Sequence, residues 1–203
     1  MSADDLAPYF SICLGVSLRV ALTEKPLPEA VLSKLETDRF KALTAPRRRA
    51  SYLLGRAAVH SLVEDHSLAF PALGYSLSHS VSATSSLAIA VEATQDAQLL
   101  AVGVDIERIS PRKLGLARRF LNDREFALFE SLPESERETI RFWTIKEAVW
   151  KAAQASAASV ALVTQAEILS LEGAQGLACF EGREYRFASC LYGYCFVTVA
   201  IEG

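Results

Sequence analysis

The stretch Val102-Gly-Val-Asp-Ile-Glu107 alternates large apolar residues with glycine and acidic residues in strict period two. Successive side chains of a β-strand point to opposite faces, so this pattern predicts a strand with one apolar and one acidic face. Two carboxylates beside a glycine, which leaves room next to them, suit a hard cation and a phosphate-bearing ligand. An edge strand with a solvated acidic face would show the same pattern, so the segment alone leaves both readings open.

A second segment, Phe142-Trp-Thr-Ile-Lys-Glu-Ala-Val-Trp-Lys151, has the spacing of a two-sided helix. Its apolar stripe would consist of Phe142, Ile145, Val149 and Ala152. Glu147 and Lys151, four residues apart, would lie on the opposite side with Lys146 at their flank. Such a pair is also an ordinary helix-stabilising feature worth about 0.3 kcal/mol. The strand and the helix together therefore indicate a site more strongly than either does alone.

These two segments resemble the paired motifs of the Sfp-type 4'-phosphopantetheinyl transferases. In that family the first motif reads Gly-(Val/Ile)-Asp-(Ile/Val)-Glu, and the second reads Trp-(Ser/Thr/Ala)-x-Lys-Glu-(Ala/Ser)-x-x-Lys. A third family motif, a Ser-His pair, is similar to Ser76-Leu-Ser-His-Ser80. The chain departs from the family in two places: residues 64–74 lack a Gly-Lys-Pro-like loop, and an alanine-rich segment follows Lys151 where the family is often rich in glycine. Alanines favour extension of the helix there.

The resemblance implies a fold and an activity. The fold would be α+β, with two similar lobes, residues 1–97 and 98–203, related by a pseudo-two-fold axis and with the active site in the cleft between them. The order of predicted elements agrees with this class, because it lacks the βα alternation of a doubly wound sheet. The activity would be that of a holo-[carrier-protein] synthase. Such an enzyme transfers 4'-phosphopantetheine from coenzyme A to a serine of an apo acyl or peptidyl carrier protein and releases 3',5'-adenosine bisphosphate.

The resemblance also implies roles for individual residues. Mg²⁺ would be held by Asp105, Glu107 and Glu147. Glu147 would also accept the serine proton, and Lys151 would stabilise or protonate the leaving phosphate. Coenzyme A would be bound by Arg39 at its 3'-phosphate and by Ser78, His79 and Lys146 elsewhere. Arg56 falls in a Leu-Gly-Arg pattern that is common in the family.

A surface for the carrier protein is expected between Ile109 and Phe126. This segment offers the cations Arg112, Lys113, Arg118 and Arg119 beside the apolar residues Leu114, Leu116 and Phe120. Such a mixture suits an acidic helix with exposed hydrophobic residues. A solvated helix whose apolar residues face the core would have the same composition. Two other functions stay open as well, a non-catalytic protein that binds carrier proteins and another Mg²⁺-dependent phosphoesterase.

Composition bounds these expectations. The chain has 203 residues, of which 51% are hydrophobic and 22% charged, enough for one domain or two small lobes. Its net charge of -3 lacks the strongly basic balance of nucleic-acid-binding proteins. We see no export signal and no apolar run of the roughly 20 residues that a membrane span needs, so we expect a cytoplasmic protein. We also expect a monomer. The four cysteines have no zinc-like spacing.

Elsewhere the pattern predicts individual elements. Residues 10–22 resemble a strand, and residues 46–63 a long helix with Arg49 and Arg56 on an outward line. His79 would lie in a polar segment that precedes a strand at 87–91. Asn122-Asp-Arg-Glu125 has the spacing of a capping box that starts a helix. Residues 176–201 read as three strands, the last two joined as a hairpin.

Overall fold

The computed structural model describes residues 2–64, 66, 68–81, 86–110, 114–133, 135–156 and 161–203. Its helices are α1 (Leu6–Leu14), η1 (Glu29–Val31), α2 (Lys34–Ala42), α3 (Pro46–Leu62), α4 (Leu114–Ala117), α5 (Asp123–Glu130), α6 (Ser135–Ser156) and η2 (Val163–Gln165). Its strands are β1 (Ser17–Thr23), β2 (Tyr75–Val81), β3 (Ser86–Gln95), β4 (Gln98–Leu99), β5 (Val102–Arg108), β6 (Glu167–Glu172), β7 (Gln175–Phe180), β8 (Arg183–Tyr192) and β9 (Cys195–Glu202).

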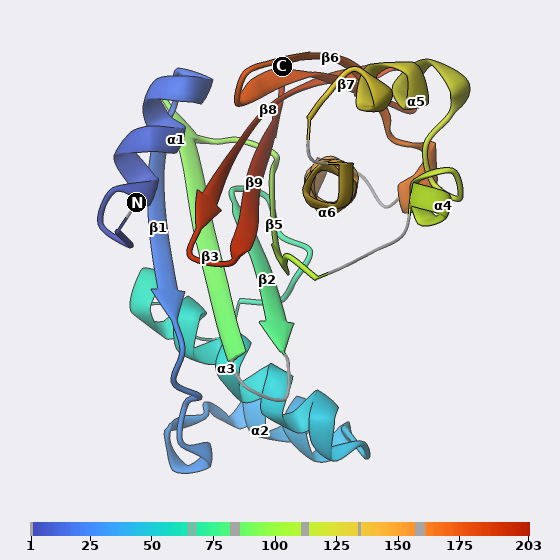
Figure 1. The fold of residues 1–203 in the computed structure, drawn as a ribbon. Helices are drawn as coiled ribbons and strands as arrows, with labels where there is room; N and C mark the ends of the chain where they lie inside the picture. Colours follow the sequence, from blue (N-terminus) through green and yellow to red (C-terminus); the bar gives the residue numbers. More distant parts are fainter. Residues whose placement is uncertain are drawn as a thin grey trace.

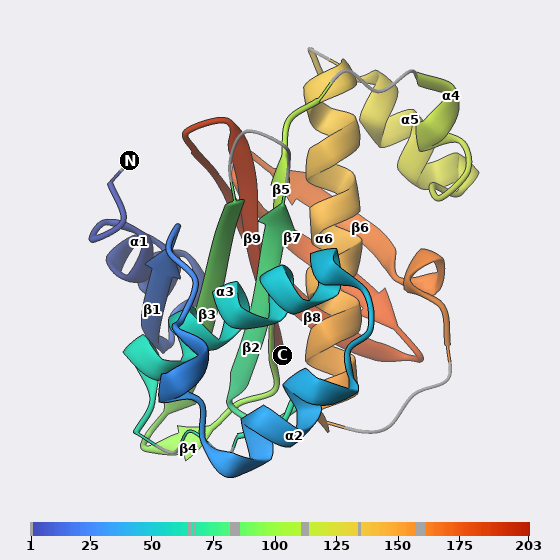
Figure 2. The same cartoon turned by 90° about the horizontal axis from the view of Figure 1, so that it is seen from below.

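The strands form two antiparallel sheets, and the predicted α+β class is therefore confirmed. The first sheet has the order β1-β3-β2, with the short β4 paired to β3, and the second has the order β5-β9-β8-β7-β6. Every strand of the first sheet precedes every strand of the second in the sequence. Strands β2 and β5 each lie at an edge of their sheet, and Figures 1 and 2 show them next to each other.

Both sheets share one hydrophobic core, and helices cover their outer faces. The shared core joins Ile89 and Val91 of β3 to Val104 of β5 and Val199 of β9. Helix α3 packs on the other face of the first sheet, and α6 packs with α4 and α5 on the other face of the second. Figure 1 shows α6 nearly end-on beside β5 and β9, and Figure 2 shows it lengthwise. The predicted apolar stripe of α6 is buried in this outer layer.

Strand β5 has the two faces that its alternation predicts. Val102, Val104 and Ile106 are fully buried in the shared core. The face that carries Gly103 and Asp105 lies against α6, because a Cβ atom at Gly103 would lie 1.8 Å from the carbonyl oxygen of Ala148. The room beside the carboxylates, which the sequence suggested for a ligand, is therefore occupied at Gly103 by the backbone of α6. The acidic face is a helix-covered face rather than the solvated edge.

The structure differs from the predicted elements in three places. Residues 10–14, predicted as strand, belong to helix α1, whose buried residues Leu6, Phe10 and Leu14 are spaced four apart and which ends at Gly15 with a φ of 67°. His79 lies within β2 rather than before a strand. Strand β6 was not predicted. By contrast, α3, the capping box of α5 and the β8–β9 hairpin agree with the prediction.

Candidate active site

Asp105 is the centre of a hydrogen-bonded group at the seam between the two sheets. Its Oδ1 atom accepts a hydrogen bond of 2.8 Å from the Ser78 hydroxyl on β2 and lies 2.7 Å from Nζ of Lys151 on α6. The Lys151 ammonium also donates to the Val104 carbonyl at 3.1 Å and to the Ser78 oxygen at 3.1 Å. Three of the predicted site residues, from three different elements, are thus in direct contact.

Glu147 lies one helical turn before Lys151 and is half-buried. Burial raises its pKa, and the Asp105 charge raises it further, while the Lys151 ammonium opposes both effects. A glutamate with a raised pKa is a stronger proton acceptor than a solvated one. Glu107 follows two residues after Asp105 on β5 and is also half-buried. Glu147 therefore lies close enough to Asp105 and Lys151 to interact with their charges, whereas Glu107 shares with Asp105 one face of β5.

His79 is coupled to the same group from the other face of β2. Desolvation by the surrounding protein lowers its pKa, the Lys151 ammonium lowers it further, and Asp105 raises it, although the residue stays open to solvent. A lowered pKa favours the neutral imidazole near neutral pH, which can donate one hydrogen bond.

Two cavities lie along β2 and could hold one extended ligand. One, of about 450 Å³, is lined by Arg39, Ser51, Tyr52, Gly55, Arg56, Phe70, Leu77 and His79. The other, of about 270 Å³, is lined by Phe70, Pro71, Tyr75, Ser76, Leu77, Trp150, Lys151 and Gln154. Because both include Phe70 and Leu77, they adjoin each other. The structure thus brings Arg39 and His79 to one cavity and Lys151 to its neighbour.

The carboxylate oxygens near Asp105 are of the kind that binds a cation, although the described side chains do not form a complete set of metal ligands. Among the residues described, no group of three or more His, Cys, Asp or Glu side chains is close enough to hold a metal ion. The Oδ2 atom of Asp105, however, is buried and has no hydrogen-bond partner within the described part of the chain. A buried carboxylate oxygen without a partner is costly, and binding of a hard cation would remove that cost. The oxygen donors at this point are those that Mg²⁺ prefers.

Lys146 does not join the site. Its Nζ atom is buried, lies 2.7 Å from Oε1 of Glu125 on α5, and donates to the Ala166 carbonyl. Desolvation lowers the Lys146 pKa, and Glu125 opposes this. The predicted position at the flank of Glu147 and Lys151 is therefore corrected: this side of α6 faces the outer core, and the ammonium is enclosed there. A coenzyme A contact by Lys146 has no support in this geometry.

Arg56 is also buried rather than outward-facing as predicted. Its guanidinium pairs with the buried carboxylate of Glu36 on α2 and donates to the carbonyls of His66 at 2.9 Å and Leu68 at 3.1 Å. His60 completes this cluster through Nε2, 2.9 Å from Glu36 Oε1. This cluster could not be predicted from the sequence, because its members come from three separate segments. Through its hydrogen bonds to the His66 and Leu68 carbonyls, Arg56 fixes the short loop that ends at Phe70. Phe70 lines both cavities.

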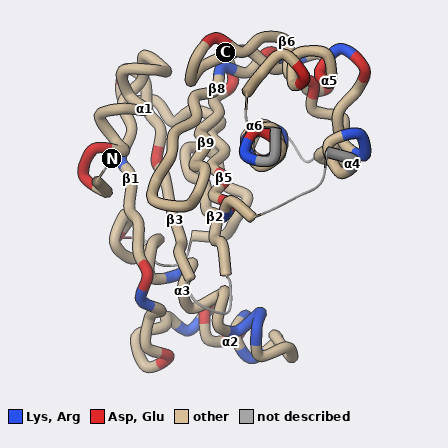
Figure 3. The backbone as a smooth tube through the Cα atoms, in the orientation of Figure 1, with Lys and Arg blue, Asp and Glu red and all other residues tan. Residues whose placement is uncertain are grey.

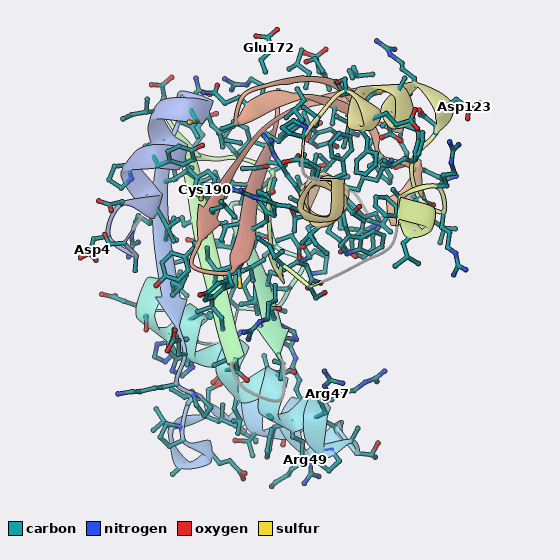
Figure 4. The ribbon with its side chains drawn as sticks, viewed as in Figure 1. Asp4, Arg47, Arg49, Asp123, Glu172 and Cys190 are labelled. Atoms are coloured by element: carbon teal, nitrogen blue, oxygen red, sulfur yellow. The ribbon has the colours of Figure 1, made fainter. Side chains whose placement is uncertain are left out.

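The remaining basic residues near α3 lie apart from the cavities. Arg47 donates to the Val81 carbonyl at 3.1 Å and Arg49 to the Leu43 carbonyl at 2.7 Å. Figure 4 shows both side chains at the end of the molecule formed by α2 and the start of α3, where Figure 3 shows several basic positions.

The expected carrier-protein segment is only partly described. Arg112 and Lys113 lie outside the described residues, as does the Leu114 side chain. Arg118 and Arg119 are exposed, with the Arg118 guanidinium 3.7 Å from the centre of the Phe126 ring. Phe120 is half-buried and packs edge-on against Trp143 of α6.

Comparisons with known proteins agree with the motifs. None of the helices in the described ranges is long and apolar enough to cross a membrane. Residues 101–195 match the family model of the 4'-phosphopantetheinyl transferase superfamily. The curated 4'-phosphopantetheinyl transferase HetI of Nostoc sp. is 32% identical over 150 residues, which cover 61% of this chain. The chain matches about 60% of the length of that relative. Residues 101–195, which carry β5 and α6, are thus similar to the 4'-phosphopantetheinyl transferase superfamily.

Proposed function

We propose that this protein transfers the 4'-phosphopantetheine group from coenzyme A to a serine hydroxyl of an apo acyl or peptidyl carrier protein. The observation that carries the proposal is the contact of Asp105 with Lys151, beside Glu147, in a segment that matches the phosphopantetheinyl transferase superfamily model. The serine oxygen forms a bond to the phosphorus that carries pantetheine. The bond from that phosphorus to the adenosine-linked phosphate breaks, and 3',5'-adenosine bisphosphate leaves.

Glu147 and Lys151 would supply the proton acceptor and the positive charge for this step. Glu147 accepts the serine proton, for which its raised pKa suits it. The Lys151 ammonium lines the cavity next to Asp105 and stabilises the charge that the leaving phosphate gains. Because the ammonium is already held by Asp105, Val104 and Ser78, it needs little rearrangement to do so.

Asp105, Glu107 and Glu147 would hold Mg²⁺, whose chemistry at this site is to neutralise the negative charge of the pyrophosphate. The buried Oδ2 atom of Asp105, which has no hydrogen-bond partner in the part of the chain that the structure describes, supports this assignment. Burial is the largest cause of the raised pKa of Glu147, and the nearby Asp105 charge adds to it, which places the two carboxylates close enough to interact.

Coenzyme A would extend along the two adjoining cavities. Arg39 would contact its 3'-phosphate, and His79 would donate to phosphate oxygens between the two cavities. The exposed position of Arg39 on the rim of the larger cavity supports this placement. The Lys151 cavity would take the pyrophosphate end.

We also propose that residues 1–97 and 98–203 form two similar lobes related by a pseudo-two-fold axis, with the site in a cleft between them. The separation of the sheets along the sequence supports this, apart from β4, which pairs with β3. The site also draws residues from both parts, which supports the two lobes: Ser78 and His79 precede the boundary, whereas Asp105 and Lys151 follow it.

The carrier protein would dock on the segment between Ile109 and Phe126. The exposed guanidinium groups of Arg118 and Arg119 support an acidic partner. Arg119→Glu should raise the KM for an apo carrier protein at low salt and leave coenzyme A binding unchanged. An unchanged KM would place the docking surface elsewhere.

A mass-spectrometric assay tests the proposed activity. The protein is incubated with coenzyme A, Mg²⁺ and a panel of apo carrier proteins, and the intact mass of each carrier is recorded. A phosphopantetheine adduct on the carrier serine is expected. Carrier binding without an adduct would indicate a non-catalytic binding protein. Phosphate release from simple esters in the absence of a carrier would indicate a phosphoesterase.

A further inference from the structure

Three serines of β2 close the free edge of the second sheet. Ser76, Ser78 and Ser80 alternate along the strand, so their side chains share the face that points toward the second sheet. Their hydroxyl oxygens accept hydrogen bonds from successive outward-facing backbone N–H groups of β5. The bonds run from Val104 at 2.9 Å, Ile106 at 3.3 Å and Arg108 at 3.3 Å. We call this arrangement the serine ladder.

The serine ladder provides acceptors for backbone N–H groups that a buried edge strand would otherwise leave unpaired. An edge strand exposes unpaired N–H groups, and a buried N–H group needs an acceptor. Here β5 is an edge strand buried against β2, and side-chain oxygens rather than backbone carbonyls supply these three acceptors. The register of β2 against β5 is therefore set by hydroxyl groups spaced two residues apart.

Ser78 differs from the other two serines because it also contacts the site. Its hydroxyl hydrogen is donated to Asp105 Oδ1 at 2.8 Å, and its oxygen accepts from Ile106 and from the Lys151 ammonium. A serine hydroxyl has one hydrogen and two lone pairs, so all of its hydrogen-bonding capacity is used. No capacity is left for a phosphate oxygen of coenzyme A.

We propose that Ser78 is a positioning residue for the cation site rather than a coenzyme A ligand. Two hydrogen bonds, from Ser78 and Lys151, converge on Oδ1 of Asp105 and fix the orientation of the carboxylate. The other oxygen, Oδ2, thereby has no hydrogen-bond partner among the described residues and can bind a cation. The inference deepens the proposed function and rests on it, since it concerns the cation that the transfer would use.

The test compares four proteins: the wild type, Ser78→Ala, Ser78→Thr and Ser80→Ala. The matched control is Ser80→Ala, because Ser80 accepts from a β5 N–H group at the same 3.3 Å but makes no contact with Asp105. Binding of Mn²⁺, used as the probe cation, is measured by electron paramagnetic resonance in the absence of coenzyme A. The KM for coenzyme A and kcat are measured with saturating Mg²⁺.

Ser78→Ala should weaken Mn²⁺ binding about 10-fold, the usual effect of losing a group that orients a metal ligand. Ser78→Thr, which retains the hydroxyl, should restore binding, and Ser80→Ala should bind Mn²⁺ like the wild type. The KM for coenzyme A should change less than about 2-fold in Ser78→Ala, because the serine does not contact the substrate.

Two results would overturn the inference. One is the absence of Mn²⁺ binding by the wild type. The other is equal Mn²⁺ affinity in Ser78→Ala and the wild type, and a rise in the KM for coenzyme A beside it would make Ser78 a substrate ligand. The proposed function fails separately, if the wild type forms no phosphopantetheine adduct on any carrier. Equal losses of thermal stability in Ser78→Ala and Ser80→Ala would show that folding does not account for the difference.

Discussion

Lys146 and Glu125 form a buried ion pair, with 2.7 Å between Nζ and Oε1, that ties α6 to α5. Glu125 also accepts from the Ile168 backbone N–H at 2.8 Å and caps α5 together with Asn122. Two neighbouring residues of the helix motif, Lys146 and Glu147, therefore have different surroundings and different roles. Lys146 is enclosed in the outer core, whereas Glu147 belongs to the Asp105 group.

The first prediction concerns this ion pair. Lys146→Met should lower the free energy of unfolding by roughly 3 kcal/mol, because it leaves a buried carboxylate without its cation. In the double variant with Glu125→Gln the loss should be smaller than the sum of the single losses, because each single change leaves a buried charge unpaired and the double change leaves none. Urea denaturation measures both. A loss below about 0.5 kcal/mol for Lys146→Met, similar to that for the exposed Lys34→Met, would contradict the pairing.

The second prediction concerns the contact between β5 and α6. Gly103→Ala should destabilise the fold by about 3 kcal/mol and reduce transfer, because the new methyl group would overlap the Ala148 carbonyl and push α6 away from Asp105. Gly55→Ala in α3 is the control. There the new methyl would meet only the flexible end of Leu77 at 3.1 Å, and alanine favours a helix. Equal stability of the two variants would show that α6 can shift without cost.

The third prediction separates catalysis from folding. Glu147→Gln should lower kcat about 100-fold or more if Glu147 accepts the serine proton. In metal-free buffer near neutral pH the same variant should unfold at an equal or higher temperature. The reason is that a raised pKa means that folding disfavours the charged glutamate. Glu138→Gln on the same helix, which removes a pair with Arg141, is the control for charge removal. Transfer by Glu147→Gln at the wild-type rate would remove Glu147 from the mechanism.

The fourth prediction concerns the 3'-phosphate. Arg39→Ala should weaken coenzyme A binding about 10-fold and change kcat less, because a contact far from the reacting bond acts mainly as uniform binding. Dephospho-coenzyme A, which lacks the 3'-phosphate, should bind the variant and the wild type alike. Lys41→Ala, a change of an exposed cation on the same helix, should have no such effect. Isothermal titration calorimetry measures each of these affinities. A full preference of the Arg39 variant for coenzyme A over its dephospho form would exclude the contact.

The fifth prediction is a pH dependence of stability. Burial raises the pKa of Glu36, but the Ser33 backbone N–H, His60 and Arg56 outweigh it, so the pKa lies below its ordinary value of 4.5. A carboxyl group with a lowered folded-state pKa stabilises the fold above its unfolded-state pKa, and this stabilisation is lost as pH falls through the folded-state value. Glu36→Gln should therefore lower the free energy of unfolding by about 3 kcal/mol at pH 7. The difference from the wild type should shrink below pH 4.5. A difference that stays constant down to acid unfolding, as expected for the exposed Glu64→Gln, would contradict the cluster.

The sequence by itself determined the local design of the elements that carry the site. Strict alternation predicted the two faces of β5, and helical spacing predicted the apolar stripe of α6 that is buried in the outer core. The capping box from Asn122 to Glu125 and the final hairpin were also legible, because each depends on residues close together in the chain. The motifs that resemble the transferase superfamily lie within these same elements, and residues 101–195 match its family model.

Only the tertiary structure decided which segment covers each face of a helix or strand. Periodicity places a side chain on one side of its own helix or strand but does not say which distant segment covers that side. Ser78 and Asp105 are separated by 27 positions and meet because two sheet edges converge. For the same reason the sequence pattern predicted wrongly that Lys146 would flank Glu147 and Lys151 in the site. It also predicted wrongly that Arg56 would face solvent. Buried Glu125 and Glu36, contributed by other helices, compensate the charges of these two residues inside the protein.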